Sequence, residues 1–326
     1  MAQILFSTHA TADTGFGHAA RCARLAALLA ARRTGLDIAL EGEFSDSALS
    51  RLAATPAVRF ARSPERAGVA VYDRMDDIQD PEVWDTHRLD GLRRRARAVL
   101  FMANGTHDPR VPGGVTAIGY KPGGPAPRPP HLLWGLDYAP VAREMLPQAP
   151  VPRVYDTALV ALGGAHGPQG LWTVLDALSR LPAIRHIDII DSPVNPLAST
   201  LPDLRTGQSH AILCGVPSLT PYLATAGVVI ASYGHLGYEA LACGAPLCLV
   251  GQKAFQVTYA GRLAQLGLCV AAGALAGADP AHLADAIAAT VRDAEGFSRA
   301  ARGAIDGCGL DRIADLILRA LDGAAA

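Results

Sequence analysis

The sequence carries almost no net charge: 29 Lys and Arg residues stand against 30 Asp and Glu residues, for a formal charge of -1 at pH 7. This balance supplies no bulk electrostatic attraction to DNA, RNA or an anionic membrane surface. A small polar or charged ligand bound in a cleft therefore fits the composition better than a nucleic acid does.

Long apolar runs and a secretion signal are missing as well. The longest uncharged stretch, 206–238, is interrupted by Pro217 and Pro221 well short of the length needed to span a membrane. No basic residue precedes Arg21, so the N-terminus lacks the charged region of a signal peptide. We expect a cytoplasmic protein without stable membrane insertion, present as a monomer or a weak dimer.

Metal-binding and common catalytic motifs are also absent. The six cysteines include no C-x-x-C pair, and most of them lie within apolar runs. This favours buried thiols in a reducing compartment over a metal or redox role. No zinc-protease, P-loop or G-x-S-x-G pattern occurs. We therefore expect neither a metal ion nor a cofactor.

The sequence does contain a regular alternation of short apolar runs and helical stretches. With 326 residues, half of them apolar, the chain is long enough for about two domains. The runs predicted as strands are 3–7, 36–40, 69–72, 98–102, 115–119, 158–162, 186–191, 211–216, 228–231 and 247–250. The stretches predicted as helices begin at His18 and lie near 46–54, 83–96, 168–180, 219–225, 235–243 and 256–266, followed by an Ala- and Leu-rich C-terminus. This alternation predicts an α/β protein with a parallel sheet in each half.

Prolines cluster in 121–153, where the helical periodicity disappears. Such a stretch is typical of a stiff connection between domains. It places the boundary between an N-terminal domain, 1–140, and a C-terminal domain, 141–326. Two Rossmann-like halves of this kind predict a ligand cleft between the carboxyl ends of their sheets.

The first candidate site follows the first predicted strand. Glycines in 14–18 permit close approach of the backbone to a ligand, and the helix that begins there directs its free N–H groups to the same place. His18 is either a general base, kept neutral by the helix dipole, or a simple helix cap. Arg21 lies on the same helix face and either binds a phosphate or stays on the surface. Asp73, after Tyr72 at a strand end, binds sugar hydroxyls, orients His18 or caps a helix.

The second candidate site follows the strand predicted at 228–231. The turn at 232–235 opens another helix and predicts a phosphate seat. Glu239 either accepts hydrogen bonds from ribose hydroxyls or only favours the helix dipole. The pair Gly163-Gly164 is a third close backbone approach or an ordinary tight turn.

With these residues identified, the chain resembles the UDP-sugar hydrolases of pseudaminic acid biosynthesis, and more broadly the GT-B glycosyltransferase-like group. The resemblance covers nearly the whole length and rests mainly on the residues from Gly15 to Ala26, which are similar to the family signature G-x-G-H-x-x-R-C-x-x-L-A. Weaker matches are Tyr72-Asp73, 135–140, Gly163-Gly164, and the turn at 234–239 with 244–246.

The resemblance implies a GT-B arrangement, with the catalytic residue in 1–140 and the nucleotide held mainly by 141–326. His18 matches the catalytic histidine, which activates water for inverting attack at the anomeric carbon and releases UDP. The substrate-binding residues implied are Gly17, Arg21, Tyr72, Asp73, Tyr138 and Gln256. The nucleotide-binding residues implied are Gly163, Gly164, Ser232, Gly234, His235 and Glu239.

The function implied is hydrolysis of a UDP-linked 2,4-diacetamido-2,4,6-trideoxyhexose on the way to a nonulosonic acid used in flagellin glycosylation. The chain departs from the family at Ala165-His166 and at Phe255, where an amide is usual. Two alternatives therefore stand beside the hydrolase: an inverting GT-B glycosyltransferase, and a nucleotide-sugar-binding protein without catalysis.

Overall fold

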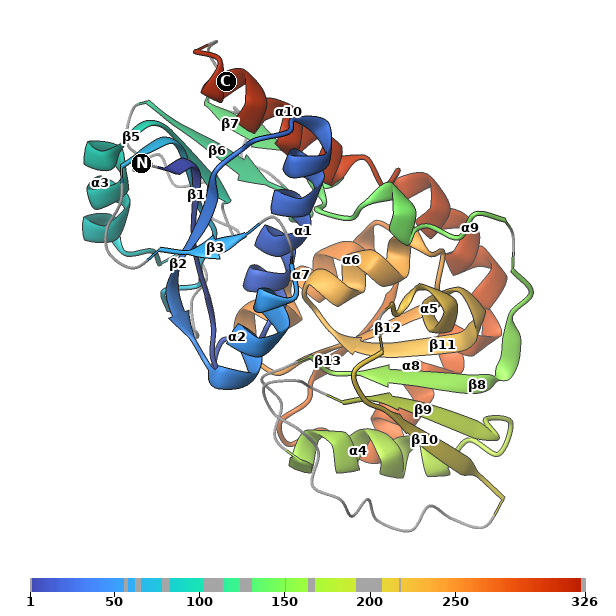
Figure 1. Cartoon of the computed structure of the whole chain (residues 1–326). Coiled ribbons are helices and arrows are strands. Elements are labelled where there is room, and N and C mark those ends of the chain that lie inside the picture. The colour runs from blue at the N-terminus through green and yellow to red at the C-terminus, as the bar shows by residue number, and fades with distance from the viewer. Residues whose placement is uncertain are drawn as a thin grey trace. The chain divides into compact units, whose positions relative to one another are not determined.

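The computed structural model describes residues 2–55, 58–61, 66–77, 83–102, 114–123, 131–149, 151–163, 168–191, 207–216 and 218–323. The chain forms two compact units. Unit 1 comprises Met1–Pro140 together with Cys308–Ala326, and unit 2 comprises Val141–Gly307. Figure 1 shows both units, with most of their helices and strands labelled.

Unit 1 is built on a seven-stranded parallel sheet with the strand order β3-β2-β1-β4-β5-β6-β7. The strands are β1 (Ala2–Ala10), β2 (Ile38–Phe44), β3 (Arg59–Phe60), β4 (Ala67–Tyr72), β5 (Ala96–Met102), β6 (Val115–Gly119) and β7 (Leu132–Trp134). The helices are α1 (Gly17–Arg32), α2 (Asp46–Ala53), α3 (Thr86–Arg95), η1 (Leu136–Tyr138) and α10 (Gly309–Leu321).

Helix α1 forms because apolar residues recur on one of its faces. Cys22, Leu25, Ala26 and Leu29 are all buried, as the predicted helical spacing requires. The helix ends at Arg32, and Arg33 follows it as the C-cap. Burying such a face against the sheet supplies most of the stability of a helix of this length.

Unit 2 repeats the design with a six-stranded parallel sheet in the order β10-β9-β8-β11-β12-β13. The strands are β8 (Val154–Ala161), β9 (His186–Ile190), β10 (Ser209–Leu213), β11 (Ala226–Ser232), β12 (Leu247–Gly251) and β13 (Val270–Ala274). The helices are η2 (Arg143–Met145), α4 (Pro168–Ser179), α5 (Thr220–Thr225), α6 (His235–Ala242), α7 (Ala254–Gln265), α8 (Pro280–Arg292) and α9 (Ala294–Ala304).

The prediction of two Rossmann-like α/β domains is thus confirmed. In each sheet the strand order reverses beside the first strand, between β1 and β4 in unit 1 and between β8 and β11 in unit 2. Ligands of such open sheets bind at the carboxyl ends of the strands next to this reversal. Both candidate sites predicted from the sequence follow strands at these two positions.

Two other predictions need correction, one on the stretch 121–153 and one on the C-terminus. The proline-rich stretch 121–153 is more than a connection, because it contains β7, which pairs with β6 at the edge of the first sheet. The C-terminal helix α10, predicted to belong to the second domain, belongs to unit 1. Its buried face, which includes Ile313 and Ile317, completes unit 1 because α10 packs against α1, β4 and β5.

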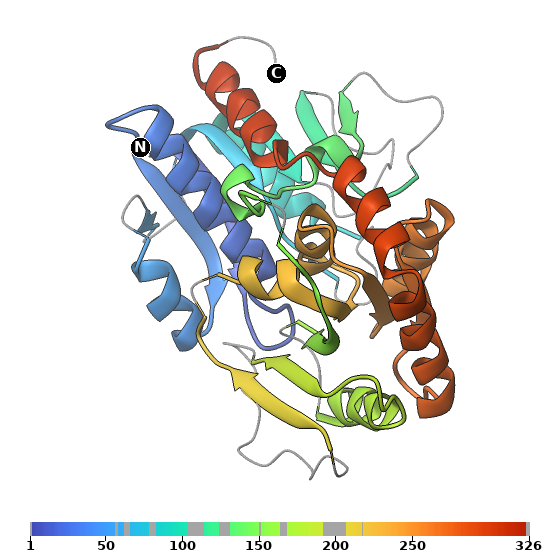
Figure 2. The same cartoon turned by 90° about the vertical axis from the view of Figure 1, so that its right-hand side faces the viewer.

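Exposed charged pairs also link α10 to the C-terminal end of α1 within unit 1. Arg32 at the end of α1 donates a hydrogen bond to Asp315 at 2.6 Å, and Arg33 pairs with Asp322 at 2.8 Å. Figures 1 and 2 show α10 in red alongside the blue α1.

Four of the six cysteines are buried, as predicted: Cys22, Cys243, Cys248 and Cys269. Within the described ranges, His, Cys, Asp and Glu side chains form no group of three or more that would suit a metal ion. The helices of the described residues are also too short or too polar to cross a membrane.

Candidate active site

The first candidate site lies at the carboxyl ends of β1 and β4, which pair in parallel so that Ser7 aligns with Tyr72. A tight loop connects β1 to α1. Its form depends on hydrogen bonds between Thr11 and Thr14 and on Gly15, whose φ of 73° is in the left-handed region. The loop delivers His18 to the start of α1, beside the residue that follows β4.

That residue is Asp73, and its carboxylate meets the His18 imidazole. The Nδ1 atom of His18 lies 2.8 Å from Oδ1 of Asp73, and both side chains are buried, at 7% and 1% exposure. Arg21 Nη2 also lies 3.1 Å from Nδ1, but a guanidinium only donates. The shorter contact therefore assigns the hydrogen to Nδ1, which donates to Asp73 and leaves the lone pair of His18 on Nε2.

Asp73 is also the partner of the next residues of the sequence signature. Arg21 Nε donates to Oδ2 of Asp73 at 2.7 Å, and Arg21 Nη2 donates to Oδ1. The thiol of Cys22 donates to Oδ2 at 3.4 Å. The His, Arg and Cys of the motif thus converge on one carboxylate 51 to 55 positions further along the chain.

The pKa values of this pair suit a neutral base beside an ionised acid. Burial, the largest effect, lowers the pKa of His18 below 6.5, and the hydrogen bond and charge of Asp73 offset only part of that decrease. Burial alone would raise the pKa of Asp73, but the Arg21 charge and the hydrogen bonds from His18 and Arg21 hold it far below its usual range. At neutral pH His18 is therefore uncharged and Asp73 is a carboxylate.

Arg21 fits neither of the two roles that its position in the sequence suggested. Its guanidinium is 3% exposed, so it is not a surface residue. Its donors are directed at Asp73 and, through Nη1, at the Tyr120 hydroxyl at 2.7 Å. The side chain thus holds Asp73 from within the domain, and the predicted phosphate or substrate contact of Arg21 has no geometric support.

The other substrate-binding residues predicted in unit 1 lie in different surroundings. Tyr72 is wholly buried against Phe101, and its hydroxyl donates to Asp76, so the ring has a packing role. Gly17 is the first residue of α1, and a side chain there would meet no atom within 4 Å. Tyr138 ends η1, a segment that packs against α10, and its side chain is half-buried.

The second candidate site lies at the carboxyl ends of β8 and β11. Gly163 follows β8 with a left-handed φ of 83°, and Ser232 ends β11. Gln252, which follows β12, joins these segments, because its amide donates to the Leu162 carbonyl and to the Ser232 hydroxyl, each at 2.6 Å. The turn then continues through Gly234, the N-cap of α6. The predicted residue Gly164 and the departure at Ala165-His166 lie outside the described residues.

Two predicted nucleotide-binding residues interact at the start of α6. His235 Nε2 lies 3.1 Å from Oε1 of Glu239, one helical turn further on, and both side chains are largely buried. Glu239 is thus held in a fixed orientation by His235.

Gln256, predicted to bind substrate, instead stabilises the backbone. Its Oε1 accepts hydrogen bonds from the N–H groups of Gln252 and Lys253, and its Nε2 donates to the Tyr233 carbonyl at 2.9 Å. The hydrogen bond from the Lys253 N–H, at the N-cap of α7, is the half of a capping box in which the N3 side chain accepts from the N-cap backbone. Both ends of the amide are engaged, so the geometry supports a role in shaping the turn near Ser232.

Three residues of these sites were not predicted from the sequence: His9, Tyr120 and Gln252. His9 is the penultimate residue of β1 and packs against His18, with ring centroids 5.1 Å apart. Their positions could have indicated them, because each of the three lies at or just beyond the end of a strand. The ligands of α/β proteins bind at these strand ends.

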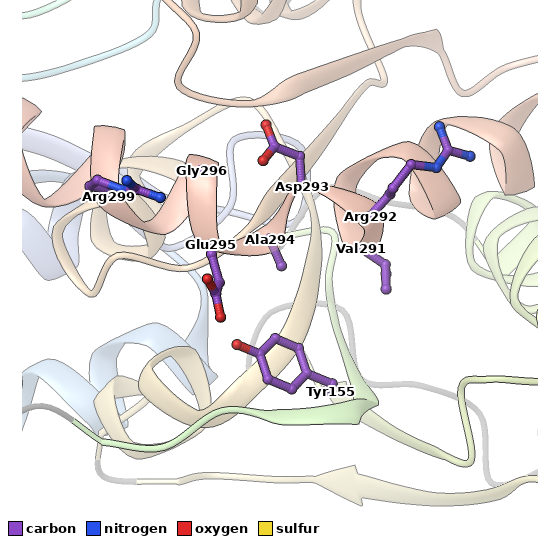
Figure 3. A pocket seen from close by; sticks show the side chains of 8 residues that line it. All are labelled: Tyr155, Val291, Arg292, Asp293, Ala294, Glu295, Gly296 and Arg299. Carbon is purple, nitrogen blue, oxygen red and sulfur yellow. The ribbon is translucent and has the colours of Figure 1, made fainter.

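Two cavities lie in unit 2, between the start of β8 and α9. The larger, of about 520 Å³, is lined partly by Arg153 and Arg302, and the smaller, of about 360 Å³, by Tyr155 and Glu295 (Figure 3). Both lie at the amino ends of the strands, opposite the end where such sheets bind ligands. Arg153 also donates to backbone carbonyls at the ends of α5 and α6, including that of Ala226 at 2.9 Å. We assign these cavities no role in the site.

The buried histidines predict that folding depends on pH. Burial and the nearby His18 and Arg74 lower the pKa of His9 from 6.5 to about 3. Below about pH 6.5, His9 is therefore protonated in the unfolded chain but stays neutral in the folded chain. The free energy of unfolding decreases as the pH falls, because protons bind preferentially to the unfolded chain. We expect His9 alone to reduce the free energy of unfolding by about 2 kcal/mol between pH 7 and pH 5.

Urea unfolding at both pH values measures this loss. It should shrink in His9→Phe and persist in His87→Ala, which changes an exposed histidine of α3. An equal pH dependence in His9→Phe and the parent protein would contradict the assignment to His9.

The chain matches no protein-family model and no curated protein sequence. Among solved structures, it is similar to the spinosyn rhamnosyltransferase SpnG complexed with thymidine diphosphate, with a TM-score of 0.57 and 15% identity over 99% of this chain and 100% of that one. The glycotransferase of kitacinnamycin matches with a TM-score of 0.57 and 17% identity, over 97% of this chain and 98% of that one. MurG of Acinetobacter baumannii matches with a TM-score of 0.53 and 13% identity, over 97% of this chain and 99% of that one. The fold is thus that of GT-B glycosyltransferases.

Proposed function

We propose that the protein cleaves a nucleoside-diphosphate sugar by inverting displacement at the anomeric carbon, with His18 as the general base. The observation that carries this proposal is the buried contact between His18 Nδ1 and Asp73. A neutral histidine with its hydrogen fixed on Nδ1 presents a lone pair on Nε2, which is the atom that a general base uses.

In the proposed reaction, Nε2 of His18 takes a proton from the attacking oxygen as this oxygen bonds to the anomeric carbon. The bond between that carbon and the diphosphate oxygen breaks, and the nucleoside diphosphate leaves with the electron pair. Asp73 stabilises the imidazolium that forms, because its carboxylate accepts the Nδ1 hydrogen bond. Attack opposite the leaving group inverts the configuration.

Water is the attacking oxygen in our first reading, which makes the protein a hydrolase of a UDP-linked deoxy-amino sugar. The support for this reading is the sequence signature around His18, from Gly15 to Ala26. Its Arg21 and Cys22 both contact Asp73, so the motif encodes one connected arrangement around the base. This gives a physical reason for the similarity to the UDP-sugar hydrolases of pseudaminic acid biosynthesis.

A hydroxyl of a second substrate is the attacking oxygen in the alternative reading, an inverting glycosyltransferase. This alternative is equally consistent with the fold, since SpnG and the kitacinnamycin protein, which are named as transferases, share that fold over nearly the whole chain. The same histidine and aspartate serve either reaction, because a base removes a proton equally from water or from an alcohol.

Unit 2 is proposed to hold the nucleotide at the carboxyl ends of β8 and β11. The N-terminus of α6, which follows Gly234, offers backbone N–H groups to the diphosphate. Gly163, with its left-handed φ, permits close approach of the backbone. Glu239, held by His235, would accept hydrogen bonds from the ribose hydroxyls.

We expect Glu239→Gln to weaken UDP binding about tenfold, since hydrogen bonds to a charged group contribute about 1.5–3 kcal/mol. Turnover at saturating substrate should change little, because Glu239 does not touch the reacting atoms in this proposal. Isothermal titration calorimetry with UDP measures the affinity. Glu144→Gln, at an exposed glutamate of η2, is the matched control. Unchanged UDP affinity in Glu239→Gln would remove the ribose assignment.

Proton and phosphorus NMR of the protein with a panel of UDP-sugars, first without an acceptor, tests the function directly. UDP together with a free sugar of inverted configuration supports the hydrolase. UDP release that requires an added alcohol supports the transferase. UDP binding without release under either condition contradicts the proposed catalysis and favours a binding protein.

A further inference from the structure

His9 is a buried titratable residue that the proposed reaction does not use. It stands near the end of β1, is 4% exposed and touches the catalytic candidate directly. Its ring is nearly perpendicular to that of His18, at an interplanar angle of 83°. Ring pairs favour an edge-to-face contact of this kind over face-to-face stacking, so the contact stabilises this relative orientation of the two rings.

The hydrogen-bond partner of His9 defines its tautomer. The backbone N–H of Met75 donates to Nε2 of His9 at 3.2 Å, so a neutral His9 carries its hydrogen on Nδ1. Met75 lies two positions after Asp73. His9 thus connects the two segments that carry the candidate base and its carboxylate, since its ring touches His18 and its Nε2 holds the strand extension beyond Asp73.

The charges around His9 keep it neutral. Burial is the largest influence, and His18, Arg74 and Arg88 disfavour a positive charge, while Asp73 alone favours one. These groups come from α1, the segment after β4, and α3. A protonated His9 would place a second positive charge against His18 as that ring takes up its proton. A neutral ring avoids this repulsion during the reaction.

We propose that His9 is a positioning residue, whose uncharged ring fixes the His18 imidazole with Nδ1 toward Asp73. This inference rests on the proposed function for its catalytic meaning. The orientation of His18 is nevertheless measurable without turnover, because ¹⁵N chemical shifts of the imidazole nitrogens report directly which nitrogen carries the hydrogen.

The test is ¹⁵N NMR of the ten histidines as a function of pH, with His18→Gln and His9→Phe used to assign the two signals. In the parent protein we expect His18 and His9 each to show a single tautomer, with hydrogen on Nδ1. In His9→Ala, His18 should become a mixture of tautomers, and kcat should fall about 10- to 100-fold with KM nearly unchanged, as expected for a displaced reacting group.

His9→Phe restores a ring edge beside His18 and should restore most of its single-tautomer signal. An unchanged His18 signal in His9→Ala would overturn the proposal, and so would a failure of His9→Phe to restore it. If His9→Ala does not fold, His9→Gln takes its place, because glutamine keeps an acceptor for Met75 and lacks the ring. Full turnover in His18→Ala would instead refute the proposed function, while the NMR comparison would still decide whether His9 orients His18.

Discussion

His18→Ala is expected to reduce turnover at least about 100-fold, because a positioned general base contributes roughly 10²- to 10⁴-fold to such reactions. UDP affinity should stay close to that of the parent protein, since the residues proposed to hold the nucleotide belong to unit 2 and His18 belongs to unit 1. Release of UDP from a UDP-sugar measures turnover, and calorimetry with UDP measures affinity.

His87→Ala provides a matched control in the same unit, because His87 is exposed on α3. A His18→Ala variant that kept full turnover would refute His18 as the base. The pH profile provides a second check. Because burial lowers the pKa of His18 below 6.5, kcat/KM should fall on the acid side with a midpoint below 6.5.

Asp73→Asn is expected to damage both activity and stability. The amide places an N–H donor against the donors of Arg21, and the buried guanidinium loses its charged partner. Breaking a buried ion pair in this way costs about 3–5 kcal/mol of the free energy of unfolding. Turnover should fall about as far as in His18→Ala, because the tautomer and orientation of His18 lose their support.

A double variant separates the two effects. Arg21→Met with Asp73→Asn removes both charges, so it should recover part of the stability measured by urea unfolding. Turnover should remain low, since His18 still lacks its carboxylate. If the double variant regained the turnover of the parent protein, Asp73 would serve only to neutralise Arg21, and its role toward His18 would be rejected.

Most of the fold was predictable because each strand and helix has a local signal. Runs such as 228–231 and 247–250 are apolar throughout, as is typical of buried parallel strands, and the buried face of α1 recurs with a helical period. The elements that were missed are short or weakly marked. β3 has two residues and β7 three, too few for any periodicity, and β13 is rich in Ala and Gly.

The position of α10 shows a different limit of sequence reasoning. Its apolar face is clear in the sequence, so the helix itself was predictable. The face does not specify which sheet it covers, because any apolar surface of suitable size would serve. Its charged partners are Arg32 at the end of α1 and the following Arg33, and they lie almost three hundred positions away along the chain.

By itself, then, the sequence determined two Rossmann-like domains and two glycine-containing turns at the carboxyl ends of strands, since backbone conformation and apolar periodicity are local properties. It left His18 and Arg21 with two roles each. Only the tertiary structure showed that both side chains meet Asp73, because the parallel register of β1 and β4 brings this residue to them. This contact supports the base role proposed for His18 and gives Arg21 a role that the sequence did not suggest, that of holding Asp73. Contacts between residues so far apart depend on strand order, which no local pattern contains.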